Sequence, residues 1–202
     1  MKFRADKTDI KRYVEEGWWE ASKGLAEFVR ENAQRNPSGI AYRTSESQIS
    51  WNEYFHAAMG LAEQIKRETT KGGRILVWLP DCPDIHICYL ACEMAGVVTV
   101  GVGWKAGLQE LKYLSEVTGA SILLSKRNNP LGKLDDISEY LNLNSLSLED
   151  IFSNHIVDGE GPNLEGSIGP SDLWFLNSTS GTTGLPKCVM QTQNRWFYFH
   201  KK

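Results

Sequence analysis

Long hydrophobic runs, paired cysteines and a surplus of one charge are all missing from this sequence of 202 residues. The four cysteines, Cys82, Cys88, Cys92 and Cys188, form no Cys-x-x-Cys pair and have no histidine beside them at metal-ligand spacing. A zinc site and a disulfide framework are therefore not expected, and the thiols are predicted to be reduced. The longest apolar-rich run, residues 89–102, includes a glutamate and is too short to span a membrane.

No excess of basic residues points to a polyanionic partner. The chain has 22 Lys and Arg against 25 Asp and Glu, for a net charge of -3. Its basic residues are scattered, and runs such as Lys126-Arg127 are too short to follow a phosphate backbone, so nucleic acid is not expected as a partner. The first seven residues mix acids with bases and lead into no apolar signal segment, so a cytoplasmic location is expected.

What the sequence does contain is enough apolar material for a packed core. Apolar residues make up 41% of the chain, charged residues only 23%, and there are seven each of Trp, Tyr and Phe. A Ser-x-x-Glu capping box at residues 50–53 predicts the start of a helix. Beyond it, apolar runs and helical patterns alternate in the manner of a doubly wound parallel sheet. The expected elements are helices over 22–33, 50–65, 84–95, 108–117 and 134–143, and strands over 40–43, 74–79, 97–102, 121–125 and 173–176.

The most informative stretch runs from Thr179 to Lys187. It offers four side-chain hydroxyls, two glycines that can adopt positive φ, and one terminal amine. Backbone amides relaxed by glycine can turn toward one point and form an anion-binding concavity, to which hydroxyls add donors and a lysine adds charge. The flanking apolar segments 173–176 and 189–190 are strand candidates that would hold this loop in a rigid frame. A polyphosphate is the ligand that such a surface favours.

A Walker A loop is the obvious competing interpretation, because Gly181 and Lys187 have its spacing. That motif requires Gly before the lysine and Ser or Thr after it, whereas this chain has Pro186 and Cys188. The segment that follows also has a strand pattern in place of a helical one. Walker A is therefore excluded.

Ten consecutive positions, residues 178–187, resemble the phosphate-binding motif of the AMP-forming acyl-CoA synthetases, luciferases and non-ribosomal peptide adenylation domains; they read STSGTTGLPK. Residues 49–54 and 96–123 resemble two further segments of that family, so the resemblance covers most of the chain. It departs at Cys188, where the family usually has Gly, and at Gln193, where a Thr-His pair is common. The resemblance implies an α/β fold with a doubly wound, largely parallel sheet and flanking helices, the N-terminal subdomain of the adenylate-forming enzymes.

The resemblance also implies an activity. A carboxylate attacks the α-phosphate of ATP with Mg²⁺, giving an acyl-adenylate and pyrophosphate, and a thiol, usually coenzyme A, then displaces AMP. Lys187 would neutralise charge on the leaving pyrophosphate, and the helix carrying residues 196–199 could either line an acyl pocket or pack in the core. The nucleotide-binding residues implied by the resemblance are Thr179, Ser180, Gly181, Thr182, Thr183, Gly184 and Lys187.

Family members typically run to about 500 residues, with the adenine-, Mg²⁺- and ribose-contacting motifs and a mobile C-terminal domain further on. The resemblance thus implies that residues 1–202 form a partial AMP-binding domain without the C-terminal domain, and no catalytic or metal-binding residue is predicted here. An incomplete piece of this kind is expected to have little activity alone. The alternative is a non-catalytic or truncated nucleotide-binding module.

A second alternative comes from the glycines at 101–107. They follow a buried strand and precede a helix with Gly-x-Gly-x-x-x-Gly spacing, a loosened dinucleotide fingerprint. Lys126 and Arg127, after the next strand, stand where an NADP enzyme would hold the 2′-phosphate. However, Trp104 and Lys105 would crowd the approach of a cofactor to the backbone, so a tight turn is the preferred interpretation over an NADP-dependent oxidoreductase.

Overall fold

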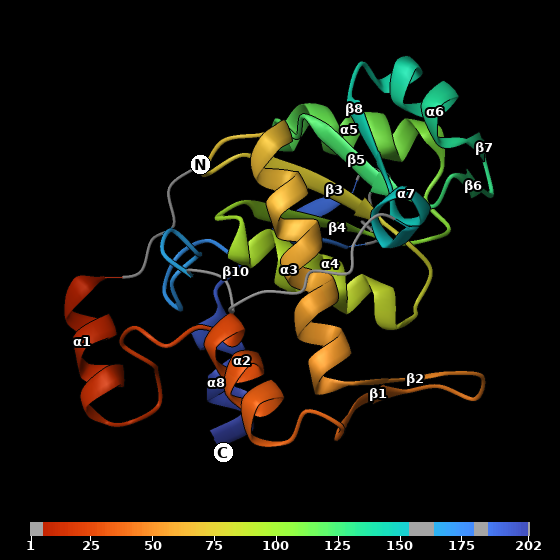
Figure 1. Cartoon of the computed structure of the whole chain (residues 1–202). Coiled ribbons are helices and arrows are strands. Elements are labelled where there is room, and N and C mark those ends of the chain that lie inside the picture. Colours follow the sequence, from red (N-terminus) through yellow and green to blue (C-terminus); the bar gives the residue numbers. More distant parts are fainter. Residues whose placement is uncertain (1–5, 154–163, 180–185, 202) are drawn as a thin grey trace.

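The computed structural model describes residues 6–153, 164–179 and 186–201. Its centre is a six-stranded sheet with helices on both faces (Figure 1), which confirms the expected doubly wound α/β class. The strands lie in the order β10-β9-β4-β3-β5-β8, and every neighbouring pair is parallel except β9 and β10. Their bounds are β3 Arg74–Trp78, β4 Val98–Val102, β5 Ile122–Ser125, β8 Asn144–Ser147, β9 Phe175–Thr179 and β10 Lys187–Gln191.

Helices precede, connect and follow these strands. Two small antiparallel sheets lie outside the main one: β1 (Ile40–Arg43) with β2 (Gln48–Ser50), and β6 (Asn128–Asn129) with β7 (Gly132–Lys133). The helices are α1 Lys7–Glu15, α2 Leu25–Arg35, α3 Trp51–Glu68, α4 Pro83–Met94, α5 Leu108–Thr118, α6 Leu134–Leu141, α7 Leu148–Ser153 and α8 Gln193–Lys201.

Strand β3 lies in the middle of the sheet because nearly all of its side chains are apolar. Successive side chains of a strand point to opposite faces, so Ile75 and Val77 enter one hydrophobic core while Leu76 and Trp78 enter the other. All four are fully buried. The near-continuous apolar run thus predicted correctly a strand that is covered on both faces.

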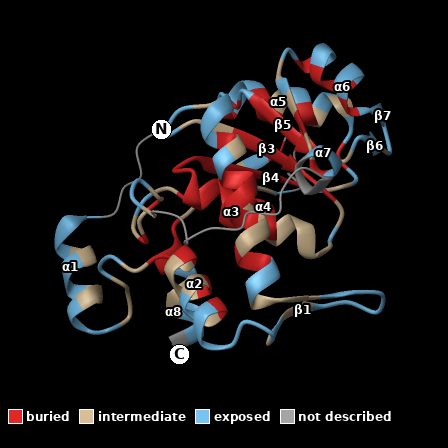
Figure 2. Cartoon of the chain, viewed as in Figure 1, coloured by how far each residue is buried: buried red, intermediate tan, exposed pale blue. Residues whose placement is uncertain are grey.

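The two helix layers match these two cores. Helices α2, α3 and α4 pack together on one face, and α5 contacts α6 on the other. Figure 2 shows the buried residues gathered in the sheet and on the helix sides that face it. Crossover helices on opposite faces define a doubly wound sheet.

The predicted capping box is present at the start of α3. The Glu53 amide donates to Ser50 Oγ over 3.2 Å, and the Ser50 amide donates to Glu53 Oε2 over 2.7 Å. Hydrogen bonds from the Ser50 amide and hydroxyl lower the pKa of Glu53, because both stabilise its carboxylate. This reciprocal arrangement satisfies backbone donors that the first helical turn leaves free.

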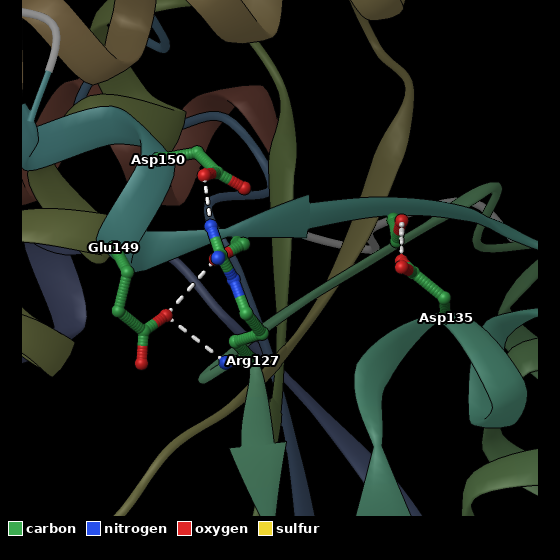
Figure 3. Close-up of polar contacts among 6 residues, drawn as sticks. Arg127, Asp135, Glu149 and Asp150 are labelled. Atoms are coloured by element: carbon green, nitrogen blue, oxygen red, sulfur yellow. Dashed lines mark hydrogen bonds and ion pairs between the residues drawn. The ribbon is translucent and has the colours of Figure 1, made fainter.

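The far edge of the sheet is held by polar contacts that the sequence pattern did not reveal (Figure 3). The Arg127 amide and the Ser147 hydroxyl both donate to Glu149 Oε2 over 2.9 Å, and the Arg127 guanidinium pairs with Asp150 on α7. Strand β8 and helices α1 and α7 were not predicted. Strand β8 and helix α7 have only four and six residues, too few to show a clear hydrophobic period. Helix α1 was missed although Ile10, Tyr13 and Val14 recur at three- and four-residue spacing.

The segment over 158–170 was expected to be a loop or a hairpin. Residues 158–163 lie outside the described residues, and 164–170 contain turns and no strand. Within the ranges that the structure describes, no helix has both the length and the apolarity needed to cross a bilayer.

Candidate functional site

The connections of the central strands create a crevice at one edge of the sheet. The chain leaves β3 through α4 to reach β4 on one side, and then leaves β4 through α5 to reach β5 on the other side of β3. The loops after β3 and β4 therefore diverge to opposite faces. In open α/β sheets, ligands bind at this kind of switch point, outside the carboxyl ends of the strands.

A cleft of about 520 Å³ lies at this switch point, within the usual size range of small-molecule sites. Leu79 and Asp81 line it from the segment after β3, and Trp104 and Lys105 from the segment after β4. The cleft thus joins apolar walls to one acidic and one basic side chain. Its other contributors are Ile85 and Tyr89 on α4, Gly101 to Gly103, and Asn177 and Ser178 on β9.

Aromatic packing sets the walls of the cleft. Trp104 packs on the buried Trp78 with ring centroids 5.1 Å apart, and Tyr89 meets Phe175 edge-on at 4.8 Å. Burial raises the pKa of Tyr89 well above its ordinary value, so the phenol stays neutral at physiological pH. A Cβ at Gly101 would lie 2.3 Å from the Phe175 ring, so only glycine leaves room for that ring against β4.

The β9–β10 hairpin brings the predicted phosphate-binding loop to the same edge. Thr179 and Lys187, the first and last predicted binding residues, pair across the two strands, and Thr179 Oγ1 donates to the Lys187 carbonyl oxygen over 3.3 Å. Both residues are exposed. The Ser178 hydroxyl, one position earlier, donates to the Gly101 carbonyl oxygen over 3.1 Å and so ties the hairpin to the cleft wall.

The middle of the predicted loop is not part of the described chain. Ser180, Gly181, Thr182, Thr183 and Gly184 lie outside the described residues, so their role remains a prediction. The described ends nevertheless confirm the frame, because two strands flank the loop. Lys187 opens a strand where a Walker A lysine would open a helix, as the sequence indicated.

The glycines at 101–107 have structural roles that do not require a dinucleotide. Gly101 and Val102 lie within β4 and pair with β3, so the first glycine is not in the turn. Gly101 is also explained by the Phe175 ring. Arg127, the supposed 2′-phosphate ligand, pairs instead with Asp150.

Directly after β10, three consecutive polar residues are buried, and sequence reasoning did not assign them a role. Asn194 Nδ2 donates to the Glu20 carbonyl oxygen and to Ser171 Oγ, both over 2.9 Å, and its Oδ1 accepts from the Glu20 amide over 2.7 Å. The burial of Thr192 and Gln193 beside it is nearly as complete, at 2% and 1% exposed. The sequence feature that could have identified these residues is the run of three polar side chains immediately after a strand.

The aromatic residues of α8 line a second cavity, of about 370 Å³. Tyr198 and Phe199 contribute to it together with Arg195, and Trp18 and Trp19 reach it from the segment after α1. Phe199 is 70% exposed, so it is not part of the core. Tyr198 and Phe199 thus line a cavity, and an acyl group as its occupant stays a prediction.

Fold and cleft together define a doubly wound α/β domain whose candidate ligand site lies at the switch point of its sheet. A family model described as AMP-binding enzyme matches residues 29–201. The chain therefore belongs to the AMP-binding enzyme family, the adenylate-forming ligases, and it corresponds to their N-terminal portion.

Individual relatives agree with this assignment. Enterobactin synthase component E of Escherichia coli (strain K12) is 25% identical over 199 residues, covering 93% of this chain and 37% of that protein. The D-alanine–D-alanyl carrier protein ligase of Bacillus cytotoxicus is 28% identical over 178 residues, covering 88% and 34%. Among solved structures, O-succinylbenzoate coenzyme A synthetase from Bacillus subtilis, in complex with AMP, has a TM-score of 0.71 at 23% identity.

This chain spans only part of the length of each of these relatives. The match to the solved synthetase covers 85% of this chain but 43% of the synthetase chain, and this chain spans about a third of the two curated relatives. The structural likeness at this identity shows the fold alone.

Proposed function

We propose that this chain supplies the polyphosphate-binding part of an enzyme that activates a carboxylic acid with ATP and passes the acyl group to a thiol. One observation carries the proposal: the hairpin holds Thr179 and Lys187 at the carboxyl edge of the sheet, beside the switch-point cleft. Membership in the AMP-binding family supports the reaction class. The relatives' names include a carrier protein ligase and a coenzyme A synthetase.

The residues of the chain have distinct tasks in this proposal. Hydroxyls of Thr179, Ser180, Thr182 and Thr183, with the amides of Gly181 and Gly184, bind the β- and γ-phosphates of ATP. The Lys187 ammonium offsets the negative charge that gathers on the leaving pyrophosphate. Fixed donors of this kind stabilise developing charge without reorganising during the reaction.

The described residues contain no cluster of side chains that would hold Mg²⁺ by itself. Within them, no group of three or more His, Cys, Asp or Glu could hold a metal ion. Mg²⁺ is commonly bound through substrate phosphates and only one or two carboxylates. We therefore propose that Mg²⁺ arrives with ATP, and we assign none of the described residues to its coordination.

For the acceptor, we propose coenzyme A, with a carrier-protein thiol as the competing choice. The coenzyme A choice follows the resemblance of residues 178–187 to the motif of the acyl-CoA synthetases, and both acceptors would present the same phosphopantetheine thiol. Thioester formation with free coenzyme A, compared with a panel of phosphopantetheinylated carrier proteins, distinguishes the two acceptors.

Titration calorimetry of this chain with Mg·ATP tests the core of the proposal. We expect measurable binding, weakened about tenfold or more by Lys187→Ala because a charge-assisted contact to phosphate is lost. Lys66→Ala, on the outer surface of α3, is the matched control and should leave the affinity unchanged. Equal affinities of all three proteins would refute the proposal. Binding without any pyrophosphate exchange over a panel of carboxylic acids would instead identify a non-catalytic nucleotide-binding module.

A further inference from the structure

A buried carboxylate lies where three helices meet. Glu93, in the last turn of α4, has no exposed surface, and its Oε1 accepts from the Ala26 amide over 2.9 Å. The Leu25 amide next to it donates to Gln193 Oε1 over 2.7 Å. Two side chains from α4 and α8 thus bind the first two amides of α2, although the three helices are far apart in sequence.

The start of α2 depends on these distant acceptors because it has no cap of its own. Its N-cap residue is Gly24, which carries no side chain to bind the free amides of the first turn. A Cβ at Gly24 would lie 2.8 Å from Glu93 Oε1 and 3.2 Å from Gln193 Oε1. The glycine therefore leaves the space that the two oxygens occupy.

The remaining polar atoms of the pair are complementary. Glu93 Oε2 and Gln193 Nε2 are both buried, and neither has a hydrogen-bond partner among the described residues. One is an acceptor when the carboxylate is ionised, and the other is a donor. No ion pair of the described residues includes Glu93, and the neutral Gln193 side chain lies beside it at Gly24.

This junction lies at the base of the β9–β10 hairpin. Gln193 is the first residue of α8 and follows the end of β10 with only Thr192 between them. The next residue, Asn194, is anchored to Glu20 and Ser171, so the start of α8 is fixed on two sides. Whatever moves Gln193 must therefore also move the strand that begins with Lys187.

We propose that Glu93 and Gln193 are positioning residues, which lock the start of α8 onto the N-terminus of α2 and thereby set the position of strand β10. The consequence for the phosphate-binding loop rests on the proposed function, whereas the junction itself does not. Neither residue touches a reacting group, so they act through the hairpin alone.

The protonation of Glu93 gives this junction a measurable signature. Burial raises the pKa of Glu93 to about 7, against the lowering effect of the Ala26 amide and the Gln193 side chain. Glu27 on α2 also raises the pKa of Glu93, and the Glu93 charge in turn raises the pKa of the Tyr54 phenol on α3. Protonation turns Glu93 Oε2 from an acceptor into a donor, which then competes with the Leu25 amide for Gln193 Oε1.

Nuclear magnetic resonance of the whole chain between pH 5.5 and 8.5 tests the proposal. We expect the Glu93 carboxyl carbon, the amides of Leu25 and Ala26, and the amides of β10 to titrate with one shared midpoint near 7. Glu93→Gln, which keeps the acceptor for Ala26, should remove the transition from all of these amides. Glu116→Gln, an exposed carboxylate on α5, is the matched control and should leave the transition in place.

Amide hydrogen exchange provides a second test, in variants that change or swap the side chains of Glu93 and Gln193. Gln193→Glu alone places two carboxylates together and should speed exchange of the Leu25 amide and the β10 amides by about tenfold or more at pH 8. Combining it with Glu93→Gln restores one amide and one carboxylate, and should restore most of the protection. Two results would overturn the proposal. One is that the β10 amide shifts stay unchanged while Glu93 titrates, and the other is that the double variant protects the Leu25 and β10 amides no better than Gln193→Glu does. Failure of Mg·ATP to bind a chain with an intact junction would count against the proposed function only.

Discussion

Phe175 on β9 packs its ring against the bare backbone of Gly101 on β4, at a point where a Cβ would come within 2.3 Å of the ring. The contact joins the strand that leads into the phosphate-binding loop to the strand that lines the cleft. It therefore fixes the hairpin against the cleft wall, and it can be tested without a ligand.

Gly101→Ala should destabilise the domain by about 1–3 kcal/mol, because the added methyl overpacks a buried contact with a rigid ring. Urea unfolding followed by circular dichroism measures this change. Gly103→Ala is the matched control: Gly103 is exposed, a Cβ added there would meet nothing within 4 Å, and stability should change by less than about 0.5 kcal/mol. A similar effect of both substitutions would contradict the packing role of Gly101.

The capping box gives a prediction about α3. Ser50→Ala should cost about 1 kcal/mol in unfolding free energy, since the Glu53 amide loses its acceptor. The lowered pKa of Glu53 adds a pH dependence: its contribution is present above the ordinary carboxyl pKa and is lost as the pH falls through the lowered value. Urea titrations near neutral pH and below the lowered pKa should therefore show a larger effect of Ser50→Ala near neutral pH. An equal effect under both conditions would exclude a contribution from the hydrogen bond that the Ser50 hydroxyl donates to Glu53 Oε2.

Glu93 predicts the opposite trend with pH. Its pKa is raised from 4.5 to about 7, so between these two values the unfolded chain ionises while the folded chain keeps the proton. The stabilisation is complete below about pH 4.5 and is lost as the pH rises through 7, at most about 3 kcal/mol by linkage. Comparing urea midpoints of wild type and Glu93→Gln across this range measures it. The urea midpoint of Glu93→Gln should rise relative to that of the wild type as the pH rises. A constant difference between the two midpoints would show that Glu93 does not titrate in this range.

Thr179→Val separates binding from folding. Among the described residues, the exposed Thr179 hydroxyl bonds only the Lys187 carbonyl oxygen, so its loss should change stability by less than about 0.5 kcal/mol. The affinity for Mg·ATP should nevertheless fall several-fold, since a donor to phosphate is removed. Calorimetry and urea unfolding of the same protein give both numbers. If Thr179→Val lowered the stability and left the affinity for Mg·ATP unchanged, the hydroxyl would serve the fold and not phosphate binding.

Lys187 makes a kinetic prediction for any preparation that completes both half-reactions. Lys187→Ala should slow pyrophosphate exchange into ATP more than it slows thioester formation from supplied acyl-adenylate, because pyrophosphate has left before the second step. The two half-reactions are measured separately on one enzyme preparation. Equal damage to both would refute the role given to this lysine.

The sequence predicted those parts of the fold whose signals are local. The run Arg74 to Trp78 has the apolar density of a central strand, and Ser50 with Glu53 forms a cap within four residues, so both were recognised. Strand β8 was missed because its four residues are mostly polar, and the hydroxyls of Ser145 and Ser147 bond to Asp135 and Glu149 from neighbouring helices.

The same distinction applies to the site. The strands that flank the proposed phosphate-binding loop were predicted, since their apolar residues are contiguous in the chain. Gln193 and Leu25 are 168 positions apart, and Glu93 and Ala26 are 67 apart, so no local pattern could bring them together. The cleft likewise depends on segments that follow different strands.

The register of β10 has a consequence for where charge can appear on the molecule. Cys188 and Met190 pack against the hydrophobic core, and the alternation of a strand sends Lys187 to the other, exposed side. A slip of one residue would exchange these two sets, driving the ammonium into the core and turning the thiol outward. The packing of Cys188 and Met190 therefore determines on which face of the sheet the positive charge of Lys187 is presented.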